Sequence, residues 1–240
     1  MKAERVFLDA VDSTNAECFR KAPSLTGPLW IVAAEQTAGR GRRARVWQSP
    51  RGNFFGSLIL HLPDEPPLRK GLRSFVAALG LYDACVSLTG MQAPFALKWP
   101  NDLLLNGCKL SGILLEATGP DLVIGIGVNL IAAPPRELVE EGAVPPVSLL
   151  AETGMRFTPK QFLEALDPAL TYWEERLVTE GFAPLREAFL ARAARLGEQI
   201  TARTGHMTRV GTFETIDNDG NLILRMEDGI QAIPAADVFF

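Results

Sequence analysis

Short apolar runs, separated by polar or glycine-rich segments, indicate β-strands along the first half of the chain. They predict strands over residues 6–8, 30–34, 54–62, 95–99, 103–105, 110–117 and 122–130. Asn106-Gly107 lies between two of these runs and is typical of a two-residue hairpin turn. Thr118-Gly119-Pro120-Asp121 predicts a second turn, so the last three runs are expected to pair in sequence order.

Apolar residues recur at helical spacing in three other places, which predicts helices over 72–86, 159–178 and 184–196. A further helix is expected to begin at Asp12-Ser13-Thr14, where Thr14 and Glu17 have the spacing of a capping box. The proline-containing segments 63–67 and 134–146 are predicted to be loops, the second with one short helical turn.

After Gly197 the pattern changes to short strands punctuated by Asp219-Gly220 and Asp228-Gly229. Strands of this length and spacing are typical of a small β-barrel or sandwich. The sequence therefore predicts two domains, a catalytic-sized α+β domain over 1–196 and a small all-β domain over 197–240.

The composition is that of an ordinary globular protein. The 240 residues carry 24 Lys plus Arg against 28 Asp plus Glu, and 47% are hydrophobic, which excludes a disordered chain, a collagen-like repeat and a disulfide scaffold. A net charge of −4 disfavours a dedicated nucleic-acid binder.

The cysteines, the N-terminal residues and the apolar stretches all indicate a protein of the reducing cytosol. Cys18, Cys85 and Cys108 show no C-x-x-C spacing, and with two histidines no His/Cys cluster for zinc can be assembled, so free thiols in a reducing cytosol are expected. The first ten residues lack the apolar segment of a secretion signal, and the apolar stretch 122–133 is shorter than the ~20 residues that span a bilayer. We predict a cytoplasmic protein without a membrane partner.

The most unusual segment is the arginine loop, which we define as Gly39–Trp47. Five arginines and no acidic residue occur between Gly39 and Arg51. Guanidinium groups match carboxylate and phosphate, and glycines let a backbone close over a ligand, so the loop is a candidate anion clamp. A solvated basic turn or an RNA-contacting segment would have the same composition.

A second segment surrounds the predicted hairpin with charge. Lys98-Trp99-Pro100-Asn101-Asp102 precedes it and Lys109-Leu110-Ser111-Gly112 follows it. The aspartate can hold Mg²⁺ and the lysines can neutralise phosphate or a reacting carboxylate. The alternative is a surface strand whose lysines extend into solvent.

Three weaker signals complete the set. Gly125-Ile126-Gly127-Val128-Asn129 places glycines in an apolar strand, where they mark a bulge or the close approach of a ligand. This run is not a dinucleotide fingerprint, and the chain has no Walker A sequence. Ser13, Thr14 and Asn15 can contact a ligand or cap a helix, and Gln36 follows a strand, where a sheet-edge position would also explain it.

The order of these segments resembles the biotin protein ligase family, also called biotin–[acetyl-CoA-carboxylase] ligases. The resemblance extends from about Val6 to the end, and its most specific parts are GRGRRARVW and KWPNDLLLNGCKLSGIL. It implies an α+β fold in which a mixed β-sheet with flanking helices, as in biotin and lipoate ligases and class II aminoacyl-tRNA synthetases, precedes a small SH3-like C-terminal β-barrel.

The resemblance also implies an activity. Family members use biotin, ATP and Mg²⁺ to make biotinyl-5′-AMP and pyrophosphate, and then transfer biotin to a lysine of a biotin carboxyl carrier protein domain. Both steps develop or hold negative charge, which the arginine loop and Lys109 would stabilise. A glycine-rich loop that closes over the reactive acyl-adenylate would exclude water.

Matched position by position, the family's catalytic roles fall on Lys109, Arg42 and Asp102, with Asp102 near the metal and the incoming amine. The biotin-binding positions are Ser13, Thr14, Asn15, Gln36, Gly39, Arg40, Arg42, Lys109 and Gly112. The adenylate-binding positions are Arg40, Arg42, Arg45, Trp47, Asn101, Lys109 and Asn129, with Trp47 stacked near the adenine.

The sequence departs from the family pattern at one position and lacks one segment. Ala44 replaces a glycine of the loop pattern GRGRxGRxW, which costs about 1 kcal/mol if that position needs a positive φ. The 11 residues before Asp12 are too few for a helix-turn-helix, so we expect a ligase that binds no specific DNA. Homodimers formed by sheet pairing are common in the family.

Three other interpretations remain at this point. A lipoate or octanoate protein ligase would share the fold and the acyl-transfer chemistry. An RNA-binding module would use the arginine loop with the β-rich C-terminal part, and a catalytically silent sensor would bind biotin or the adenylate without turnover.

Overall fold

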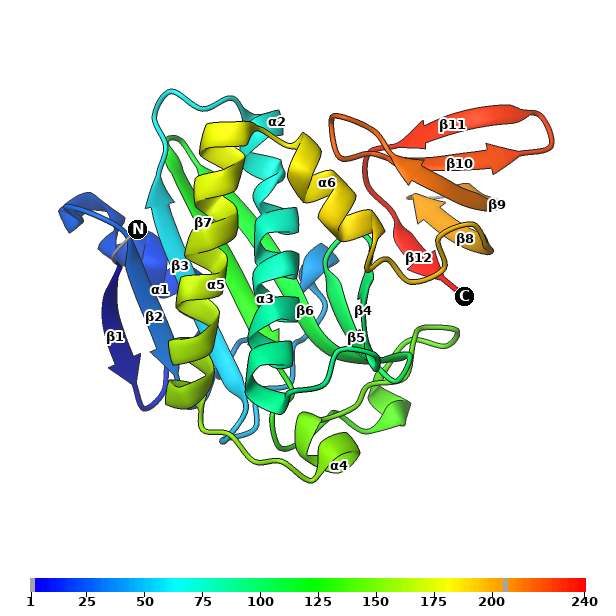
Figure 1. Ribbon diagram of the computed structural model, residues 1–240. Helices are drawn as coiled ribbons and strands as arrows, with labels where there is room; N and C mark the ends of the chain where they lie inside the picture. Colours follow the sequence, from blue (N-terminus) through cyan, green and yellow to red (C-terminus); the bar gives the residue numbers. More distant parts are fainter. Residues whose placement is uncertain (1–2, 205–206) are drawn as a thin grey trace.

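The computed structural model describes residues 3–204 and 207–240, which form two β-sheets and the helices around them (Figure 1). The large sheet has seven strands in the order β1-β2-β3-β7-β6-β5-β4. Only the β1–β2 pair is parallel, and the other neighbours are antiparallel. Its strands are β1 (Glu4–Leu8), β2 (Leu29–Ala33), β3 (Phe54–His61), β4 (Phe95–Lys98), β5 (Asp102–Leu105), β6 (Cys108–Thr118) and β7 (Asp121–Val128).

Both predicted turns are present. Asn106 and Gly107 have φ values of 50° and 76°, the two positive angles of a type I′ turn, and they join β5 to β6. Gly119 (φ 56°) lies in the turn that joins β6 to β7, and these two strands pair along almost their whole length. The pairing brings the Lys98–Asp102 and Lys109–Gly112 segments to the same end of the sheet.

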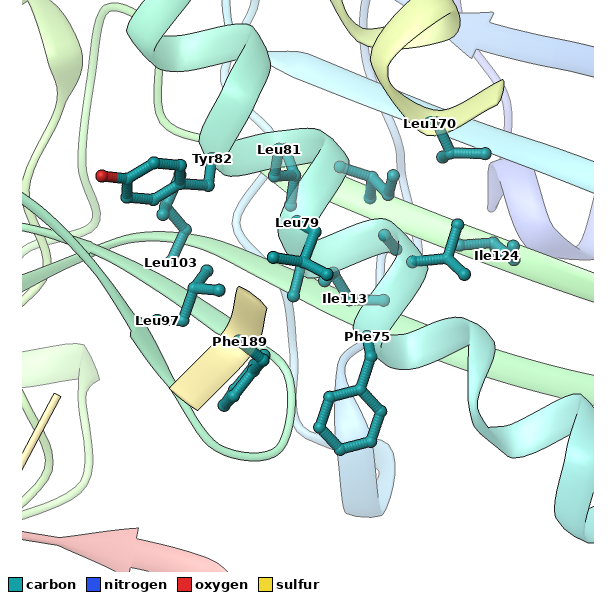
Figure 2. Packing of buried hydrophobic residues seen from close by; sticks show 14 of the residues in the cluster. Phe75, Leu79, Leu81, Tyr82, Leu97, Leu103, Ile113, Ile124, Leu170 and Phe189 are labelled. Carbon is teal, nitrogen blue, oxygen red and sulfur yellow. The ribbon is translucent and has the colours of Figure 1, made fainter. Parts of the chain in front are cut away.

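Helices α3 (Arg73–Thr89) and α5 (Pro159–Glu180) pack against each other and cover one face of the large sheet (Figure 1). The main hydrophobic core fills the space between these helices and the sheet. Figure 2 shows Leu79 and Leu81 of α3 in this cluster, with Ile113 and Ile124 of the sheet. Burying these apolar side chains supplies the main driving force for the fold.

Helix α1 (Thr14–Lys21) packs on β2, β3 and β7 with a second, smaller core that includes Cys18. Its cap differs from the predicted capping box. Ser13 is the N-cap and accepts from the Ala16 backbone N–H, whereas Thr14 is the first helical residue. The Thr14 side chain is therefore free of the capping role that its spacing to Glu17 suggested.

One helical prediction needs correction, and two short helices were not predicted. Helix α6 (Ala183–Leu190) is shorter than predicted, because the chain turns after it and reaches positive φ at Arg195 and Gly197. Helices α2 (Pro67–Gly71) and α4 (Leu149–Thr153) were not predicted, since five residues are too few to show a helical period. Single 3₁₀ turns occur at Ala22–Ser24, Arg42–Ala44 and Arg136–Leu138, and the last is the turn expected within 134–146.

The C-terminal part forms a five-stranded, SH3-like antiparallel sheet in the order β11-β10-β9-β8-β12. Its strands are β8 (Gln199–Thr204), β9 (Met207–Ile216), β10 (Leu222–Met226), β11 (Gly229–Ile233) and β12 (Asp237–Phe239). Helix α6 lies between the two sheets (Figure 1). Trp99, at the end of β4, donates its indole N–H to the Gly220 carbonyl, which joins the two parts of the chain.

One helical stretch, Pro67–Thr89, is long and apolar enough to cross a membrane by length and composition alone. It differs from the stretch 122–133 considered from the sequence. In the folded chain 67% of its most apolar 18-residue segment is buried, and α3 packs against α5. Burial of this kind is also found in the core helix of a soluble domain.

Candidate functional site

A cavity of about 770 Å³ lies between the large sheet, the arginine loop, the 134–146 segment and β12. This volume is in the range of small-molecule binding sites. All but one of the site residues predicted from the sequence line it: Ser13, Thr14, Asn15, Gln36, Arg40, Arg42, Arg45, Trp47, Asn101, Asp102, Lys109, Gly112 and Asn129.

Gly39 is the predicted residue that does not line the cavity. A Cβ at this position would lie 2.8 Å from the Trp47 carbonyl oxygen and 2.8 Å from the Ser49 hydroxyl. Glycine is therefore required because the two ends of the arginine loop approach each other here. The Trp47 N–H donates to the Gly39 carbonyl at 2.9 Å and closes the loop.

One end of the cavity is formed by the uncharged polar side chains of Thr14, Asn15 and Gln36. Thr14 donates its backbone N–H to Gln36 Oε1 at 2.9 Å, and its hydroxyl lies 3.0 Å from the same oxygen. The Gln36 amide nitrogen in turn donates to Ser49 Oγ at 3.2 Å. Thr14 and Asn15 are almost fully buried at the start of α1, so their orientation is fixed by packing and by these hydrogen bonds.

Two residues that the sequence did not single out complete this polar end. Ser57 on β3 is fully buried and its Oγ lies 2.7 Å from Thr14 Oγ1 and 2.6 Å from Asn15 Oδ1. Glu116 on β6 accepts from Asn15 Nδ2 at 2.8 Å and pairs with Arg40 at 3.2 Å. Neither residue is marked by a pattern in its own strand. The pairing of β3, β7 and β6 in the sheet brings both of them close to α1.

The other end of the cavity is charged. Asp102 Oδ1 lies 2.8 Å from Lys109 Nζ, and Asp102 Oδ2 lies 3.6 Å from Lys98 Nζ. Burial would raise the pKa of Asp102, but the two ammonium groups outweigh it and hold that pKa below the ordinary value. Burial lowers the pKa of Lys98, against the opposing effect of Asp102.

Arg42 extends from the arginine loop to the same end. One guanidinium nitrogen, Nη1, donates to Asn101 Oδ1 at 3.3 Å and to the Ala236 carbonyl at 3.2 Å. Asn101 donates its amide to the Ile113 carbonyl at 2.5 Å. Burial lowers the pKa of Arg42 from its usual high value, and a guanidinium group still stays protonated.

Two further arginines of the loop, Arg43 and Arg45, point to the C-terminal part. Arg43 and Arg45 pair with Asp237 on β12 at 2.7 and 2.6 Å, and Arg45 also pairs with Glu140 at 2.9 Å. Arg51 is outside the site and pairs with Asp9 and Glu35. The loop is therefore closed over the cavity by carboxylates from two distant segments.

The loop backbone confirms the conformation considered for Ala44. Ala44 has φ 57° and the preceding Arg43 has φ 55°. Left-handed residues other than glycine cost about 1–2 kcal/mol each. The hydrogen bond from the Gly41 N–H to the Arg45 carbonyl (2.8 Å) and the ion pairs of Arg43 and Arg45 hold this strained turn.

The strand glycines contact side chains of the chain itself. A Cβ at Gly127 would lie 2.5 Å from the Trp47 indole, and a Cβ at Gly112 would lie 3.1 Å from it. At Gly125 a Cβ would lie 2.2 Å from Asn15 Oδ1. The Trp47 ring thus lies across the sheet in the middle of the cavity, with Lys109 Nζ 5.8 Å from its centroid.

The charged end offers little to a metal ion alone. No group of three or more His, Cys, Asp or Glu side chains that could hold a metal is present among the described residues. Asp102 faces two ammonium groups, a surrounding that suits an anion better than a cation. The residues present therefore do not form a self-sufficient Mg²⁺ site.

Asn129 lies at the edge of the charged end, at the end of β7. Its amide donates to the Val147 carbonyl at 3.1 Å, and its backbone N–H donates to the Leu110 carbonyl at 3.0 Å. It is 2% exposed, so its position is fixed before any ligand arrives.

The fold and cavity define a class of protein: a ligand-binding α+β domain whose cavity is covered by an arginine loop and closed at one side by an SH3-like domain. Comparison with known proteins identifies the family. The sequence profile of the biotin/lipoate A/B protein ligase family matches residues 7–129, and that of the biotin protein ligase C-terminal domain matches residues 196–240. The chain belongs to the biotin/lipoate A/B protein ligase family.

Individual relatives agree with this assignment. The chain is 54% identical over 238 residues to a biotin–[acetyl-CoA-carboxylase] ligase of Paracoccus denitrificans, covering 97% of this chain and 99% of that one. It is 32% identical to the bifunctional ligase/repressor BirA of Escherichia coli, over 93% of this chain and 69% of BirA. The biotin protein ligase of Aquifex aeolicus, solved with biotin and ATP, superposes with a TM-score of 0.83 at 27% identity, covering 98% of this chain and 97% of that one.

Proposed function

We propose that this chain is a biotin–[acetyl-CoA-carboxylase] ligase. It activates biotin with ATP to biotinyl-5′-AMP and pyrophosphate, and then transfers biotin to a lysine of a biotin carboxyl carrier protein domain. The full-length similarity to the Paracoccus denitrificans ligase supports this function over lipoate transfer and over RNA binding.

The single observation that carries the proposal is the division of the cavity into three parts. Thr14 and Gln36 form a neutral polar end, the Trp47 indole covers a glycine-lined middle, and Lys109 and Arg42 lie at a cationic end. Biotin has the same three parts in the same order: a neutral ureido ring, an aliphatic chain and a carboxylate. On this basis we propose that the residues predicted from the sequence to bind biotin and the adenylate do so in this cavity.

In the first step the biotin carboxylate attacks the α-phosphorus of ATP, and pyrophosphate leaves. Lys109 and Arg42 stabilise the negative charge that gathers between carboxylate and phosphate. Asp102 keeps the Lys109 ammonium at this end by their 2.8 Å ion pair. Arg40, Arg45 and Asn101 hold the arginine loop and the hairpin in place around the adenylate, with Trp47 and Asn129 lining its pocket.

In the second step the acceptor lysine amine attacks the carbonyl carbon of the mixed anhydride. A bond forms between nitrogen and carbon, the carbon–oxygen bond to phosphate breaks, and AMP leaves with the electron pair. The nitrogen gives up one proton, which the departing phosphate can accept. Asp102 is the buried carboxylate at this end and is proposed to face the incoming amine. The closed arginine loop keeps water from the anhydride until the amine arrives.

Mg²⁺ is proposed to enter with ATP. An ion of this kind is commonly held by one or two carboxylates together with substrate phosphates. Asp102 is the carboxylate that the charged end would contribute, and the phosphates would supply most of the remaining ligands.

The proposed function also implies a compartment, a domain organisation and a set of partners. We propose a cytoplasmic enzyme with a catalytic domain over 1–196 and a C-terminal domain over 197–240. Its protein partner is the carboxyl carrier domain, and it acts without specific DNA binding and without a membrane. A homodimer formed by sheet pairing is proposed from the family, and sedimentation of the purified chain would test it.

The deciding experiment is ATP–pyrophosphate exchange driven by biotin, with lipoate and octanoate as controls. The expected result is exchange that occurs with biotin and not with lipoate or octanoate. Labelled biotin should then be transferred to a carrier domain. Exchange with lipoate but not with biotin would move the chain to the lipoate branch of the family. Biotin binding without exchange would instead support a sensor.

A further inference from the structure

We infer that Glu116 is a positioning residue that sets the direction of a hydrogen-bond chain behind the polar end of the cavity. The chain runs from Thr14 through Ser57 and Asn15 to Glu116. Its direction prepares the Thr14 hydroxyl and the Gln36 carbonyl oxygen to receive an N–H group of the ligand. The inference rests on the proposed function and identifies a part of the site that controls which ligand is accepted.

Glu116 determines the orientation of the Asn15 amide. A carboxylate only accepts hydrogen bonds, so the Asn15 atom that lies 2.8 Å from Glu116 Oε2 must be the amide nitrogen. The amide oxygen of Asn15 therefore points the other way, to Ser57. Its Oδ1 lies 2.6 Å from Ser57 Oγ, and because an amide oxygen cannot donate, the single proton of Ser57 belongs to this contact.

The number of hydroxyl protons determines the direction of the remaining contacts. Ser57 Oγ also lies 2.7 Å from Thr14 Oγ1, so the two hydroxyl protons of Ser57 and Thr14 have three oxygen–oxygen contacts to serve. The contact from Thr14 to Gln36 is the longest of the three, so we place the Thr14 proton on the shorter contact to Ser57. Thr14 Oγ1 and Gln36 Oε1 are then two acceptors 3.0 Å apart with no proton between them. The orientation of Gln36 is fixed independently, because Oε1 accepts the Thr14 backbone N–H at 2.9 Å.

Two acceptors side by side at the cavity wall favour a donor between them and disfavour another acceptor. Thr14 and Gln36 both line the cavity. A cyclic urea N–H would satisfy them, whereas a ligand with an ester oxygen or an N-methyl group at this point would leave them unpaired. Buried unpaired groups cost more than an average hydrogen bond contributes, so this pair selects strongly against such ligands.

The surroundings keep the chain in one direction. Ser57 is fully buried, and Gly125 lets the Asn15 amide lie directly on β7, where a Cβ would be 2.2 Å from Oδ1. Arg40 Nη2 lies 3.2 and 3.3 Å from the two carboxylate oxygens of Glu116, so Glu116 pairs with Arg40 and accepts from Asn15 at the same time. The same carboxylate thus holds the arginine loop and orients the chain, so closing the loop and preparing the acceptor pair are linked.

The test compares Glu116→Gln and Ser57→Ala with the unmodified full-length chain. In Glu116→Gln the new amide can donate to Asn15, which permits the amide of Asn15 to turn over and the chain to reverse. Ser57→Ala removes the middle of the chain without touching Arg40. Each is expected to raise the Kd and KM for biotin about tenfold. Ser57→Ala leaves the pair between Arg40 and Glu116 intact, so in that variant the KM for ATP and kcat at saturating biotin should be nearly unchanged.

Two readouts separate this role from a general structural one. The double variant should bind biotin as weakly as either single variant, since both changes break one chain. A biotin analogue methylated on the ureido nitrogens should bind all four proteins with similar, low affinity. The matched control is Glu152→Gln, which removes a carboxylate that accepts from Asn106 at 2.5 Å outside the cavity and should leave biotin binding unchanged.

Additive losses in the double variant, or unchanged biotin affinity in Glu116→Gln, would overturn the inference. Glu116 is partly exposed, so Glu116→Gln keeps the fold and decides the question even if Ser57→Ala does not fold. The failure of the proposed function gives a different result. In that case the unmodified chain itself shows no biotin binding and no biotin-dependent exchange.

Discussion

The carboxylate of Asp102 and the ammonium of Lys109 form an ion pair of 2.8 Å at the cationic end of the cavity. The two residues belong to neighbouring strands, β5 and β6, which the Asn106-Gly107 turn joins. In the register of this pair Asp102 lies opposite Gly112 and Lys109 lies opposite Leu104, so the ion pair runs diagonally between the strands. The pair holds a cation where the reacting carboxylate and phosphate are proposed to meet.

Lys109→Ala is expected to lower biotin-dependent ATP–pyrophosphate exchange by about 100-fold or more, because it removes a fixed cation from the place where negative charge develops. Exchange measured at saturating biotin and ATP tests this. Lys160→Ala, which removes an exposed lysine of α5, is the control and should keep full exchange. Equal rates in the two variants would contradict the role of Lys109.

The Asp102 ion pair also predicts a pH dependence of stability. The pKa of Asp102 in the folded protein lies below the ordinary 3.8, so as the pH falls the unfolded chain is protonated first. The contribution of Asp102 is therefore fully present above about pH 4 and is lost as the pH falls through its folded pKa. Urea unfolding should show the difference between the unmodified chain and Asp102→Asn shrinking from pH 6 to pH 3. A difference that stays constant over this range would contradict the shift.

Asp237→Asn is expected to loosen the arginine loop, since Asp237 pairs with both Arg43 and Arg45. Trypsin should cleave after these arginines several times faster in the variant, and the adenylate should be lost to water sooner. The control is Glu214→Gln, which breaks the pair with Arg225 in the C-terminal sheet away from the loop. If both variants are cleaved at the same rate, Asp237 does not hold the loop.

Gly127→Ala is expected to displace Trp47, because the added methyl group would lie 2.5 Å from the indole. The KM for biotin should rise at least tenfold, since the indole covers the middle of the cavity and its displacement costs about 1.4 kcal/mol or more of binding. Gly27→Ala, where a Cβ meets nothing within 4 Å, should leave the KM unchanged. An unchanged KM in Gly127→Ala would mean that Trp47 does not cover the ligand.

Ala44→Gly should relax the arginine loop, because Ala44 has φ 57° and glycine adopts this angle without penalty. The closed loop gains up to about 1 kcal/mol from lost strain, offset in part by the greater freedom of the open loop. We expect slower release of biotinyl-5′-AMP, measured by chase with unlabelled biotin. Ala191→Gly, at a helical C-cap, should not change this rate. Faster release in Ala44→Gly would show that the strain does not oppose closure.

The sequence by itself determined the strands of the large sheet, the two turns, α3 and α5, and most of the residues that line the cavity. These features follow from local patterns: alternation and apolar runs, the Asn-Gly turn, and the paired motifs around Arg42 and Lys109. Short elements such as α4 were not predicted, because five residues cannot show a helical period. The capping box was assigned one residue late, since Ser13 and Thr14 are both good caps and only packing on the sheet chooses between them.

The tertiary structure decided which distant side chains hold the site together. Glu116 meets Asn15 across 101 positions of the chain, and Asp237 meets Arg43 across 194. No local pattern marks Ser57, Glu116 or Asp237, because a single polar residue in a strand is equally compatible with solvent and with a buried partner. Their roles depend on sheet register and on the docking of the C-terminal sheet, both of which depend on burying apolar surface between segments far apart in the sequence.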